Sequence, residues 1–391
     1  MLQGQKDVSG RRERAEILTM EDRPSSDQLE ELGLYDSNAP DAEDQLRLLR
    51  GAFDLGATLQ EVTRAAAVRY NFGPLMLDLA MRPVGDTQDL VDFAASGSDP
   101  ELIRRLWAAL GLPDAESPVV RVTPDAADAL RLMTDMAALF GEEAALGVVR
   151  VMGSTMARLA ETISGVFRVG EELPQLKTGS SRAEVAQTYT RIVRDLLPSF
   201  LEALGAVFRR HLVDVSYQMW STDTEQAAVT LERTICFADL VGSTELLRTV
   251  SIREMANMVR RFEEQVWDLV SAGGGRVVKL IGDEAMVVFA EPSRACRVGL
   301  DLIDQSEHSV RIGMAHGTVV SLYGDYYGET VNLAARLVNR ADPSSLLVSE
   351  HVRDRAGHGL AFDALQPLVL KGFAEAVSVF RAVRTEEDFS N

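Results

Sequence analysis

The sequence predicts an α+β protein of two domains, because hydrophobic periodicity changes along the chain. From about residue 41 to 213, apolar residues recur three and four positions apart, as in amphipathic helices, and strand signals are nearly absent. After residue 229, short runs rich in Val and Ile alternate with helical patterns. A length of 391 residues also exceeds what one hydrophobic core usually serves. We therefore expect an all-α bundle followed by a ferredoxin-like sheet domain with its helices on one face.

The predicted boundaries follow composition. Residues 1–40 are polar without periodicity and are predicted to be a disordered tail, in which Met20 offers an alternative start of translation. Residues 41–213 form the helical domain, and the polar stretch 214–228 is its linker to the second domain at 229–384. Residues 385–391 are a C-terminal tail.

Capping signals mark the helices of the first domain. Thr58 with Glu61, and Ser181 with Glu184, have the spacing of capping boxes, and Thr123 with Pro124 gives an N-cap followed by a proline at the first helical position. Pro198 is expected to kink or split the last helical run, 185–213. Apolar stripes such as the one from Val148 to Leu159 are expected to be buried in the bundle.

Strands and helices of the second domain are read from its alternating runs. Helices are expected at 251–270 and 292–305. The expected strands are 233–238, 276–281, 285–290, 310–315, 346–349 and 377–382.

Charge and composition narrow the functional classes. The net charge of −19 disfavours nucleic acid and anionic membranes as partners. A helix-turn-helix pattern at 86–111, in which Ser98 is expected to cap the second helix, carries five acidic and two basic residues, a net charge of −3. We therefore expect it to pack rather than to bind DNA. Cys236 and Cys296 are expected to pack without a disulfide, as in a reducing cytoplasm. No apolar run approaches the roughly 20 residues of a membrane span, so a cytoplasmic protein is expected.

Two aspartates of the second domain are candidate metal ligands. Asp239 ends an apolar strand in FADLVGST, where Gly242, Ser243 and Thr244 could cradle phosphate at a helix N-terminus. Asp283 lies in KLIGDEAMVVF, in the turn of a hairpin. If that hairpin lies beside the first strand, the two acids converge and suit Mg²⁺ or Mn²⁺. Taken singly, each could instead be a helix cap or a turn residue.

Two further pairs complete a set for nucleotide chemistry. In GDYYGETVNLAARL, Asp325 precedes a helix expected to start near Thr330, on which Asn332 and Arg336 lie one turn apart on one face. Lys279 can donate to an adenine ring nitrogen while Asp325 accepts from the 6-amino group, whereas guanine presents the opposite pattern. ATP is therefore the expected substrate, although Lys279 could instead be a surface lysine of the hairpin.

On these three motifs, residues 229–384 resemble the catalytic domain of class III nucleotidyl cyclases, and the first domain resembles the helical autoinhibitory domain of soluble actinobacterial adenylate cyclases. The resemblance implies that Asp239 and Asp283, with the backbone carbonyl of Leu240, bind two divalent metals. It implies that Lys279 and Asp325 select adenine, that Asn332 orients the ribose and that Arg336 stabilises the α-phosphate. Lys371 would contact the terminal phosphates, although Phe373 stands where many members have a second lysine.

The implied activity is that of an adenylate cyclase, a phosphorus–oxygen lyase. The ribose 3′-oxygen attacks the α-phosphorus and pyrophosphate leaves. In the family the metal acids come from one subunit and the other two pairs from its partner, so the resemblance implies a homodimer joined through the catalytic domain. The alternative is a catalytically silent or DNA-linked regulator that keeps the cyclase fold.

Regulation is expected to come from the first domain, through a small-molecule, lipid or proton effector. His211 follows Arg209 and Arg210 just before the linker, and a proton-sensitive junction is one hypothesis for it. The alternative is a solvated histidine at a helix end. Methionines along the first domain, such as Met76, Met133 and Met152, could line an apolar effector site or simply pack in the core.

Overall fold

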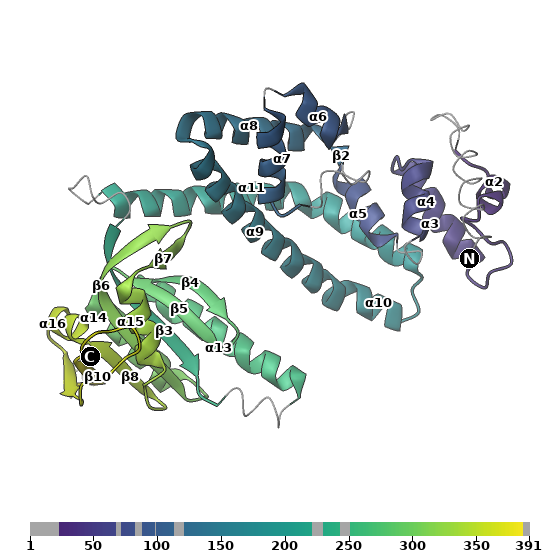
Figure 1. Cartoon of the computed structure of the whole chain (residues 1–391). Helices are drawn as coiled ribbons and strands as arrows, with labels where there is room; N and C mark the ends of the chain where they lie inside the picture. Colours follow the sequence, from purple (N-terminus) through teal and green to yellow (C-terminus); the bar gives the residue numbers. More distant parts are fainter. Residues whose placement is uncertain are drawn as a thin grey trace, which may run out of the picture. The chain divides into compact units, whose positions relative to one another are not determined.

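The computed structural model describes residues 23–67, 72–82, 88–97, 99–112, 121–220, 230–242 and 251–385. The chain divides into two compact units, Met1–Asp214 and Val215–Asn391 (Figure 1).

The first unit is helical. Its elements are α2 (Ser26–Glu31), α3 (Ala42–Asp54), α4 (Leu59–Ala67), α5 (Gly73–Met81), α6 (Leu90–Ser96), α7 (Pro100–Ala109), α8 (Pro124–Phe140), α9 (Glu142–Phe167), the π-helical turn η1 (Arg168–Glu172), α10 (Leu173–Lys177) and α11 (Arg182–Trp220). Two short antiparallel strands, β1 (Gln88–Asp89) and β2 (Arg121–Val122), were not predicted. The predicted capping boxes at Thr58 and Ser181 are confirmed. In each, the amide of the cap residue donates to the carboxylate of the Glu three positions later, and the amide of that Glu donates to the cap hydroxyl.

Two separate cores hold this unit. One joins α2 to α5 with the first turns of α11, and the other joins α6, α7, α8 and the start of α9, where Trp107 and Leu130 are buried. The first core corrects the prediction that residues 26–34 belong to a disordered tail. Ser25 and Gln28 form a capping box that starts α2, and Leu29 and Leu34 are buried, so this segment is folded. Residues 1–22 lie outside the described part.

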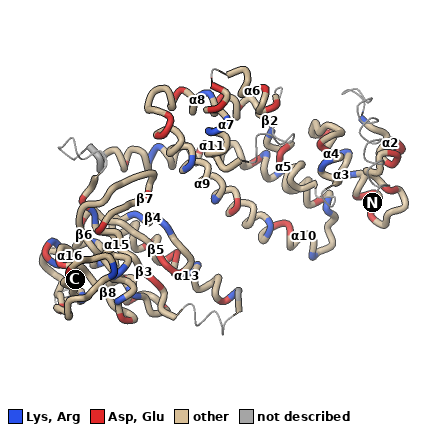
Figure 2. The backbone as a smooth tube through the Cα atoms, in the orientation of Figure 1, with Lys and Arg blue, Asp and Glu red and all other residues tan. Residues whose placement is uncertain are grey.

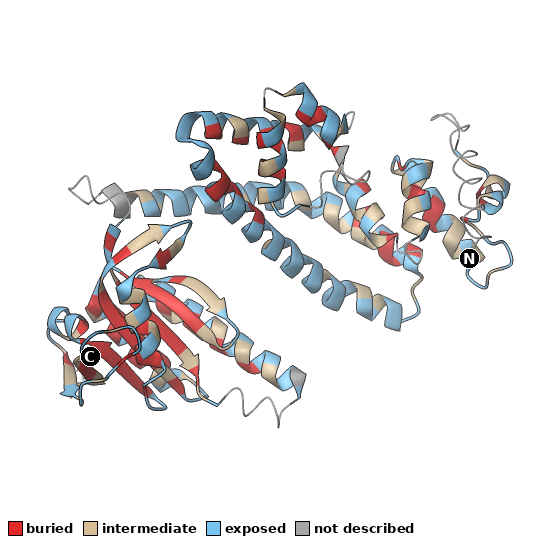
Figure 3. Cartoon of the chain, viewed as in Figure 1, coloured by how far each residue is buried: buried red, intermediate tan, exposed pale blue. Residues whose placement is uncertain are grey.

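Three other expectations for this unit are corrected. Pro198 does not split its helix, since α11 runs unbroken from Arg182 to Trp220 and enters the predicted linker. Asp99 caps α7 by accepting from the Leu102 amide, whereas Ser98, the expected cap, lies outside the described residues. The stripe that begins at Val148 is not buried; Val148, Val151 and Met152 are exposed (Figure 3).

The second unit is built on one mixed sheet. Its elements are β3 (Thr230–Leu240), α13 (Ile252–Ala272), β4 (Arg276–Ile281), β5 (Glu284–Phe289), α14 (Pro292–Gln305), β6 (Val310–Leu322), β7 (Asp325–Tyr327), α15 (Glu329–Val338), β8 (Ser345–Ser349), α16 (Glu350–Arg355), β9 (Leu360–Ala364) and β10 (Val379–Arg384). The strand order is β4-β5-β3-β6-β8-β10-β9, with β7 paired to β6. The run β4-β5-β3-β6 has the ferredoxin-like arrangement, with β7 and β9 as strands that the sequence did not predict.

Helices cover both faces of this sheet, not one as expected. Alternate residues of β3 divide between the faces: Cys236 and Ala238 pack with α13, α14 and α16, whereas Ile235 and Phe237 pack on the side of α15. Cys236 and Cys296 are free thiols buried in the first of these cores, and burial raises the pKa of Cys296 to about 12. None of the described helices is long and apolar enough to span a bilayer.

Candidate active site

The two candidate metal acids lie side by side. Asp239 is the penultimate residue of β3, and Asp283 lies in the turn between β4 and β5, where Gly282 takes φ +65°. The amide of Leu240 donates to the carbonyl oxygen of Asp283 at 3.2 Å, which fixes the turn against the end of β3. The fold therefore brings together, as predicted, two acids that are 44 positions apart in the sequence.

Two charged residues that the sequence analysis missed flank Asp239. Glu284 and Arg311 are its cross-strand neighbours on β5 and β6. Arg311 donates to Oδ2 of Asp239 through Nε at 2.7 Å and through Nη2 at 2.5 Å. The signal for Arg311 was present, because it is a charged residue at the start of an otherwise apolar strand, 310–315.

Electrostatics at this edge favour a cation. Burial raises the pKa of Asp239, and Asp283 raises it further, while the bond and charge of Arg311 oppose both. Burial also raises the pKa of Glu284, with Asp239 and Asp283 contributing. Carboxylates whose pKa is raised by one another are stabilised in their ionised form by a bound positive charge. Among the described residues, no group of three or more His, Cys, Asp or Glu side chains is arranged to hold a metal ion.

The proposed base-reading pair is in direct contact. Lys279 Nζ donates to Asp325 Oδ2 at 2.5 Å, with both side chains partly exposed. Lys279 follows an irregularity in the β4–β5 register, and Asp325 begins β7. Arg276 steadies the same junction, since its guanidinium lies 5.4 Å from the Tyr326 ring centroid. The hairpin of β6 and β7 therefore brings Asp325 onto β4, across 46 positions of sequence.

Asn332 and Arg336 lie one turn apart on the exposed side of α15. The opposite side of this helix is buried through Ala334, Leu337 and Val338. The helix begins at Glu329, one residue before the predicted start. No hydrogen bond or ion pair within the described part of the chain holds either side chain, so both are open to a ligand or to another chain.

Lys371 and His211 are exposed, and part of the predicted phosphate loop lies outside the described residues. Gly242 ends its described segment at φ +78°, and Ser243 and Thr244 lie outside the described residues. Lys371 is exposed in the turn after buried Leu370, with no ion pair to another described residue. His211 is an exposed residue in the interior of α11, which continues to Trp220, so the interpretation as a histidine at a helix end is wrong.

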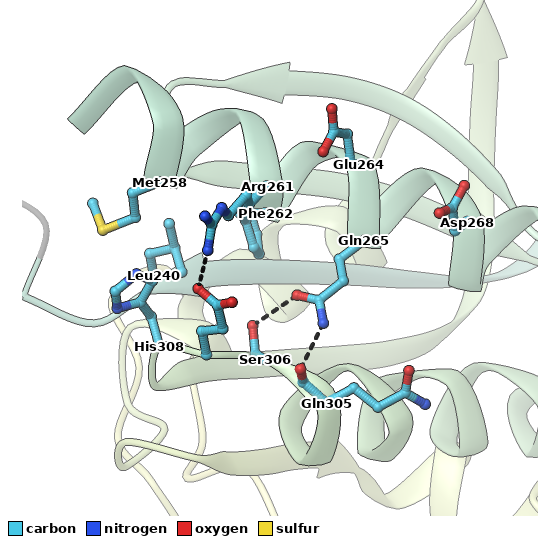
Figure 4. A pocket seen from close by; sticks show the side chains of 11 residues that line it. Leu240, Met258, Arg261, Phe262, Glu264, Gln265, Asp268, Gln305, Ser306 and His308 are labelled. Atoms are coloured by element: carbon cyan, nitrogen blue, oxygen red, sulfur yellow. Dashed lines mark hydrogen bonds and ion pairs between the residues drawn. The ribbon is translucent and has the colours of Figure 1, made fainter. Parts of the chain in front are cut away.

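A cavity of about 310 Å³ lies elsewhere in the second unit, between α13 and the segment after α14 (Figure 4). Gln265 crosses it, donating to the Gln305 carbonyl and accepting from Ser306, and Arg261 pairs with Glu307. The Leu240 side chain lines this cavity and packs in the core with α13 and α14, on the face of the sheet that α15 does not cover. The other predicted site residues do not line it, so it is not the candidate active site.

Comparison with known proteins identifies the family of proteins that this chain resembles. Residues 226–381 match the adenylate and guanylate cyclase catalytic domain. An uncharacterized protein of Mycobacterium tuberculosis is 35% identical over 336 residues, 84% of this chain and 87% of that protein. A protein of Streptomyces coelicolor named adenylate cyclase is 35% identical over 285 residues, 70% of this chain and 74% of that one. The crystal structure of the adenylyl cyclase CyaB from P. aeruginosa aligns with 41% of this chain and 97% of its own, at 19% identity and a TM-score of 0.38.

The Streptomyces relative is 35% identical over 74% of its own length, and the catalytic-domain match covers the sheet of the second unit up to the first three residues of β10. The chain belongs to the family of class III adenylate cyclases.

Proposed function

We propose that this chain converts ATP into 3′,5′-cyclic AMP and pyrophosphate. The observation that carries the proposal is the Lys279–Asp325 contact at 2.5 Å, a donor and an acceptor held together on the sheet face that also carries Asp239. In the reaction the ribose 3′-hydroxyl loses its proton as the 3′-oxygen bonds to the α-phosphorus, and the bond from that phosphorus to the bridging oxygen of the leaving pyrophosphate breaks.

Asp239 and Asp283, with the Leu240 carbonyl, would hold two divalent cations, Mg²⁺ or Mn²⁺. The donor set fits hard cations, because it is made of oxygens. Burial, together with the charge of Asp283, raises the pKa of Asp239, and a bound cation would favour its ionised form. When bound, the cations would lower the pKa of the 3′-hydroxyl and neutralise charge on the phosphates. Arg311 supports the same site, because it holds Asp239 in place and adds a positive charge beside it.

The remaining residues would bind and orient the nucleotide. Lys279 would donate to adenine N1 while Asp325 accepts from the 6-amino group. Asn332 would hold the ribose, and Arg336 would stabilise the charge that develops on the transferring phosphoryl group. Lys371 and the Gly242–Thr244 segment would contact the phosphates.

We propose that two copies of the chain share each site. Asn332 and Arg336 point away from their own core, which suits residues that complete a partner's site. The same region exposes apolar side chains of the β4–β5 turn and the β6–β7 hairpin, namely Ile281, Leu322, Tyr323 and Tyr327. Contact between apolar residues around a polar centre is typical of a protein interface.

Turnover of ATP and GTP by the full chain with Mg²⁺ or Mn²⁺ tests the activity. Asp239→Asn and Asp283→Asn should each lower the rate with ATP by about 100-fold or more, because each removes a charged metal ligand. Asp363→Asn is the matched control, since this carboxylate lies exposed on β9. If wild-type protein makes no cyclic nucleotide while remaining folded, the chain is a silent regulator that keeps the fold.

Regulation by the helical unit is a separate part of the proposal. The second unit has its own cores on both faces of the sheet, so a chain that begins near residue 225 can be compared with the full chain. A higher rate in the shorter chain would support autoinhibition, whereas equal rates would contradict it. A proton effector acting through His211 requires that His211→Ala change the pH profile of the full chain.

A further inference from the structure

Another cavity lies within the helical unit, and two of its lining residues carry buried polar atoms that lack a partner. The cavity has a volume of about 250 Å³. It is formed by the loop after α2, the first two turns of α3, the residue before α5 and the first residue of α11. None of the residues proposed for the active site lines it, so it is a separate feature of the molecule.

The polar part of the lining consists of hydrogen-bond acceptors. Oδ1 of Asp44 and Oε1 of Gln45 are buried and have no hydrogen-bond partner among the described residues. The orientation of the Gln45 amide is fixed by its other end, because Nε2 donates to Oδ1 of Asp41 at 2.8 Å and a carboxylate can only accept. Buried acceptors are costly unless a protein group, a water or a ligand donates to them. Two such atoms on neighbouring residues of one cavity favour a ligand that donates.

The charge around these acceptors favours a cationic donor. Asp41 and Asp44 both line the cavity, and residues 26–45 hold seven acidic residues and no basic one. The red segments of α2 in Figure 2 belong to this acidic run. Oδ2 of Asp44 already accepts from the Ala183 amide at 3.4 Å, so Oδ1 remains for a ligand. An ammonium group has three N–H donors and no acceptor, and it can therefore donate to Asp44 and Gln45 together.

The rest of the lining is mostly apolar. Leu34, Leu48, Leu49 and Phe72 line the cavity, and each is at most 9% exposed. All four belong to the core that joins α2 to α5 with the first turns of α11, so they are held in place by packing. A metal ion would not use this lining, because hard cations bind oxygen ligands. Sites for small organic molecules combine an apolar lining with a few polar groups, and the ligand therefore has an apolar body.

Arg182 adds a positive charge to the same cavity. It is the exposed first residue of α11, and it forms no ion pair with another residue of the described chain. The bond from the Ala183 amide to Asp44 places Arg182 close to the acceptors. A guanidinium group suits a carboxylate, to which it can donate through two parallel N–H groups. Acceptors, a guanidinium group and an apolar lining match the three parts of an apolar α-amino acid.

We propose that this cavity binds an apolar α-amino acid such as leucine. The ammonium group would donate to Oδ1 of Asp44 and Oε1 of Gln45, the carboxylate would accept from Arg182, and the side chain would lie against the apolar lining. The ligand would join α3 to the start of α11, the helix that continues past Asp214 into the second unit. The amino acid would thereby be an effector of the cyclase, a role that rests on the proposed function, whereas binding itself does not.

Three compounds with one apolar body test the chemistry of the ligand. L-leucine carries both charges, isoamylamine lacks the carboxylate, and isocaproate lacks the ammonium group. In calorimetric titrations of the full chain we expect L-leucine to bind most tightly, isoamylamine about 10-fold more weakly and isocaproate about 100-fold more weakly or not at all, because a site built for a donor rejects an analogue without one.

L-valine and L-phenylalanine extend the titration to smaller and larger side chains. If none of the three amino acids binds, the proposal is wrong. Binding of isocaproate as tight as that of L-leucine would also overturn it, in favour of a site for fatty acids.

Substitutions in the first turn of α3 test where the amino acid binds. Asp44→Asn keeps an oxygen for the Ala183 amide but removes the charge, and it should weaken L-leucine binding by about 10-fold or more. Gln45→Met keeps the length of the side chain but removes the acceptor, and it carries the test if Asp44→Asn fails to fold. Glu43→Gln is the matched control, because this exposed neighbour does not line the cavity. Wild-type affinity in both cavity variants would place the amino acid elsewhere and contradict the proposal.

Arg182→Gln tests the contact with the carboxylate. This variant should bind L-leucine only as tightly as isoamylamine, while its affinity for isoamylamine should equal that of the wild type. An equal loss for both compounds would show that Arg182 supports the structure and does not hold a carboxylate.

Binding and turnover are measured separately, so the outcomes distinguish this proposal from the catalytic one. A chain that binds L-leucine but makes no cyclic AMP would support the site and contradict the proposed activity. A chain that makes cyclic AMP but binds none of the amino acids would leave the activity standing and overturn the site. An equal cyclase rate with and without saturating L-leucine would contradict the effector role.

Discussion

At the scale of single residues, the Lys279–Asp325 pair gives the sharpest statement about substrate. Adenine presents an acceptor at N1 and a donor at its 6-amino group, and guanine presents the reverse. Lys279→Glu combined with Asp325→Lys keeps an ion pair at the 2.5 Å contact but inverts its hydrogen-bonding pattern. We expect the ratio of kcat/KM for ATP to that for GTP to fall by about 100-fold or more, since a polar site rejects a base that leaves its groups unpaired.

The single variant Lys279→Glu is the control for this exchange. It places two carboxylates against each other, so turnover of both nucleotides should drop without a change of preference. An unaltered preference in the double variant would show that the pair does not read the base.

His316 is a buried residue to which the proposed chemistry assigns no role. Arg355 Nη1 donates to its Nε2 at 2.7 Å, so the ring proton sits on Nδ1 and donates to Thr234 Oγ1 at 3.0 Å. Burial lowers the pKa of His316, and the charge of Arg355 lowers it further, against the opposite effect of Glu232. The folded state therefore favours the neutral ring, and this stability is present above the unfolded pKa of about 6.5 and is lost as the pH falls below it.

We expect the amide protons of β3 and β6 to exchange faster at pH 5.5 than at pH 7.5, after correction for the intrinsic exchange rate. His316→Gln should reduce that difference, because the group that gains a proton on unfolding is gone. His358→Gln is the control, since that histidine lies in the turn between α16 and β9. An equal pH effect in wild type and His316→Gln would show that other groups are responsible.

At the scale of elements, Gly313 sets the position of the helix that carries Asn332 and Arg336. A Cβ at Gly313 of β6 would overlap the amide nitrogen of Val338 and the carbonyl oxygen of Ala334, both in α15. Gly313→Ala should therefore destabilise the catalytic unit by about 1–3 kcal/mol. Because α15 must shift, cyclase turnover should fall by as much as about 100-fold even in protein that remains folded.

Gly299→Ala in α14 is the comparison for this prediction. Its Cβ would meet the terminal methyl of Met314, which can rotate away, so we expect a smaller loss of stability and near-normal turnover. Chemical unfolding and initial rates measure both variants. Normal turnover in Gly313→Ala would contradict the positioning role of this contact.

Elements with local signals were predictable from the sequence, whereas those formed by long-range pairing were not. The capping boxes at Thr58 and Ser181 and the Gly282 turn depend on neighbours within a few residues, and the structure has them. The strand β7 has three residues and exists because it pairs with β6. A proline within a helix removes one hydrogen bond and usually kinks or breaks the helix. The helix α11 nevertheless continues through Pro198, so the sequence around this proline did not predict the outcome.

At the scale of the whole molecule, the site residues that lie in sequence motifs could be predicted, whereas those that only strand pairing brings together could not. Motif spacing identified Asp239, Asp283 and the Lys279–Asp325 pair, and the sheet register supplies the reason that they gather. Arg311 and Glu284 were missed, because they become neighbours of Asp239 only through strand pairing. Whether an apolar stripe is covered also depends on the assembly, and so the exposure of α9 and α11 was not foreseen.

A shared active site makes a prediction that no single-chain site can satisfy. Asp239→Ala and Arg336→Ala should each be inactive as homodimers, because every site then lacks one essential group. In a mixed dimer, however, the acids of one chain meet the arginine of the other in one intact site, while the second site lacks both. With random pairing, a co-expressed equal mixture should recover about a quarter of wild-type activity. Asp239→Ala mixed with Asp283→Ala is the matched control and should recover nothing, since both changes fall on the same half of the site. A mixture of Asp239→Ala and Arg336→Ala that stays inactive, although tagged chains copurify, would place all these groups within one chain.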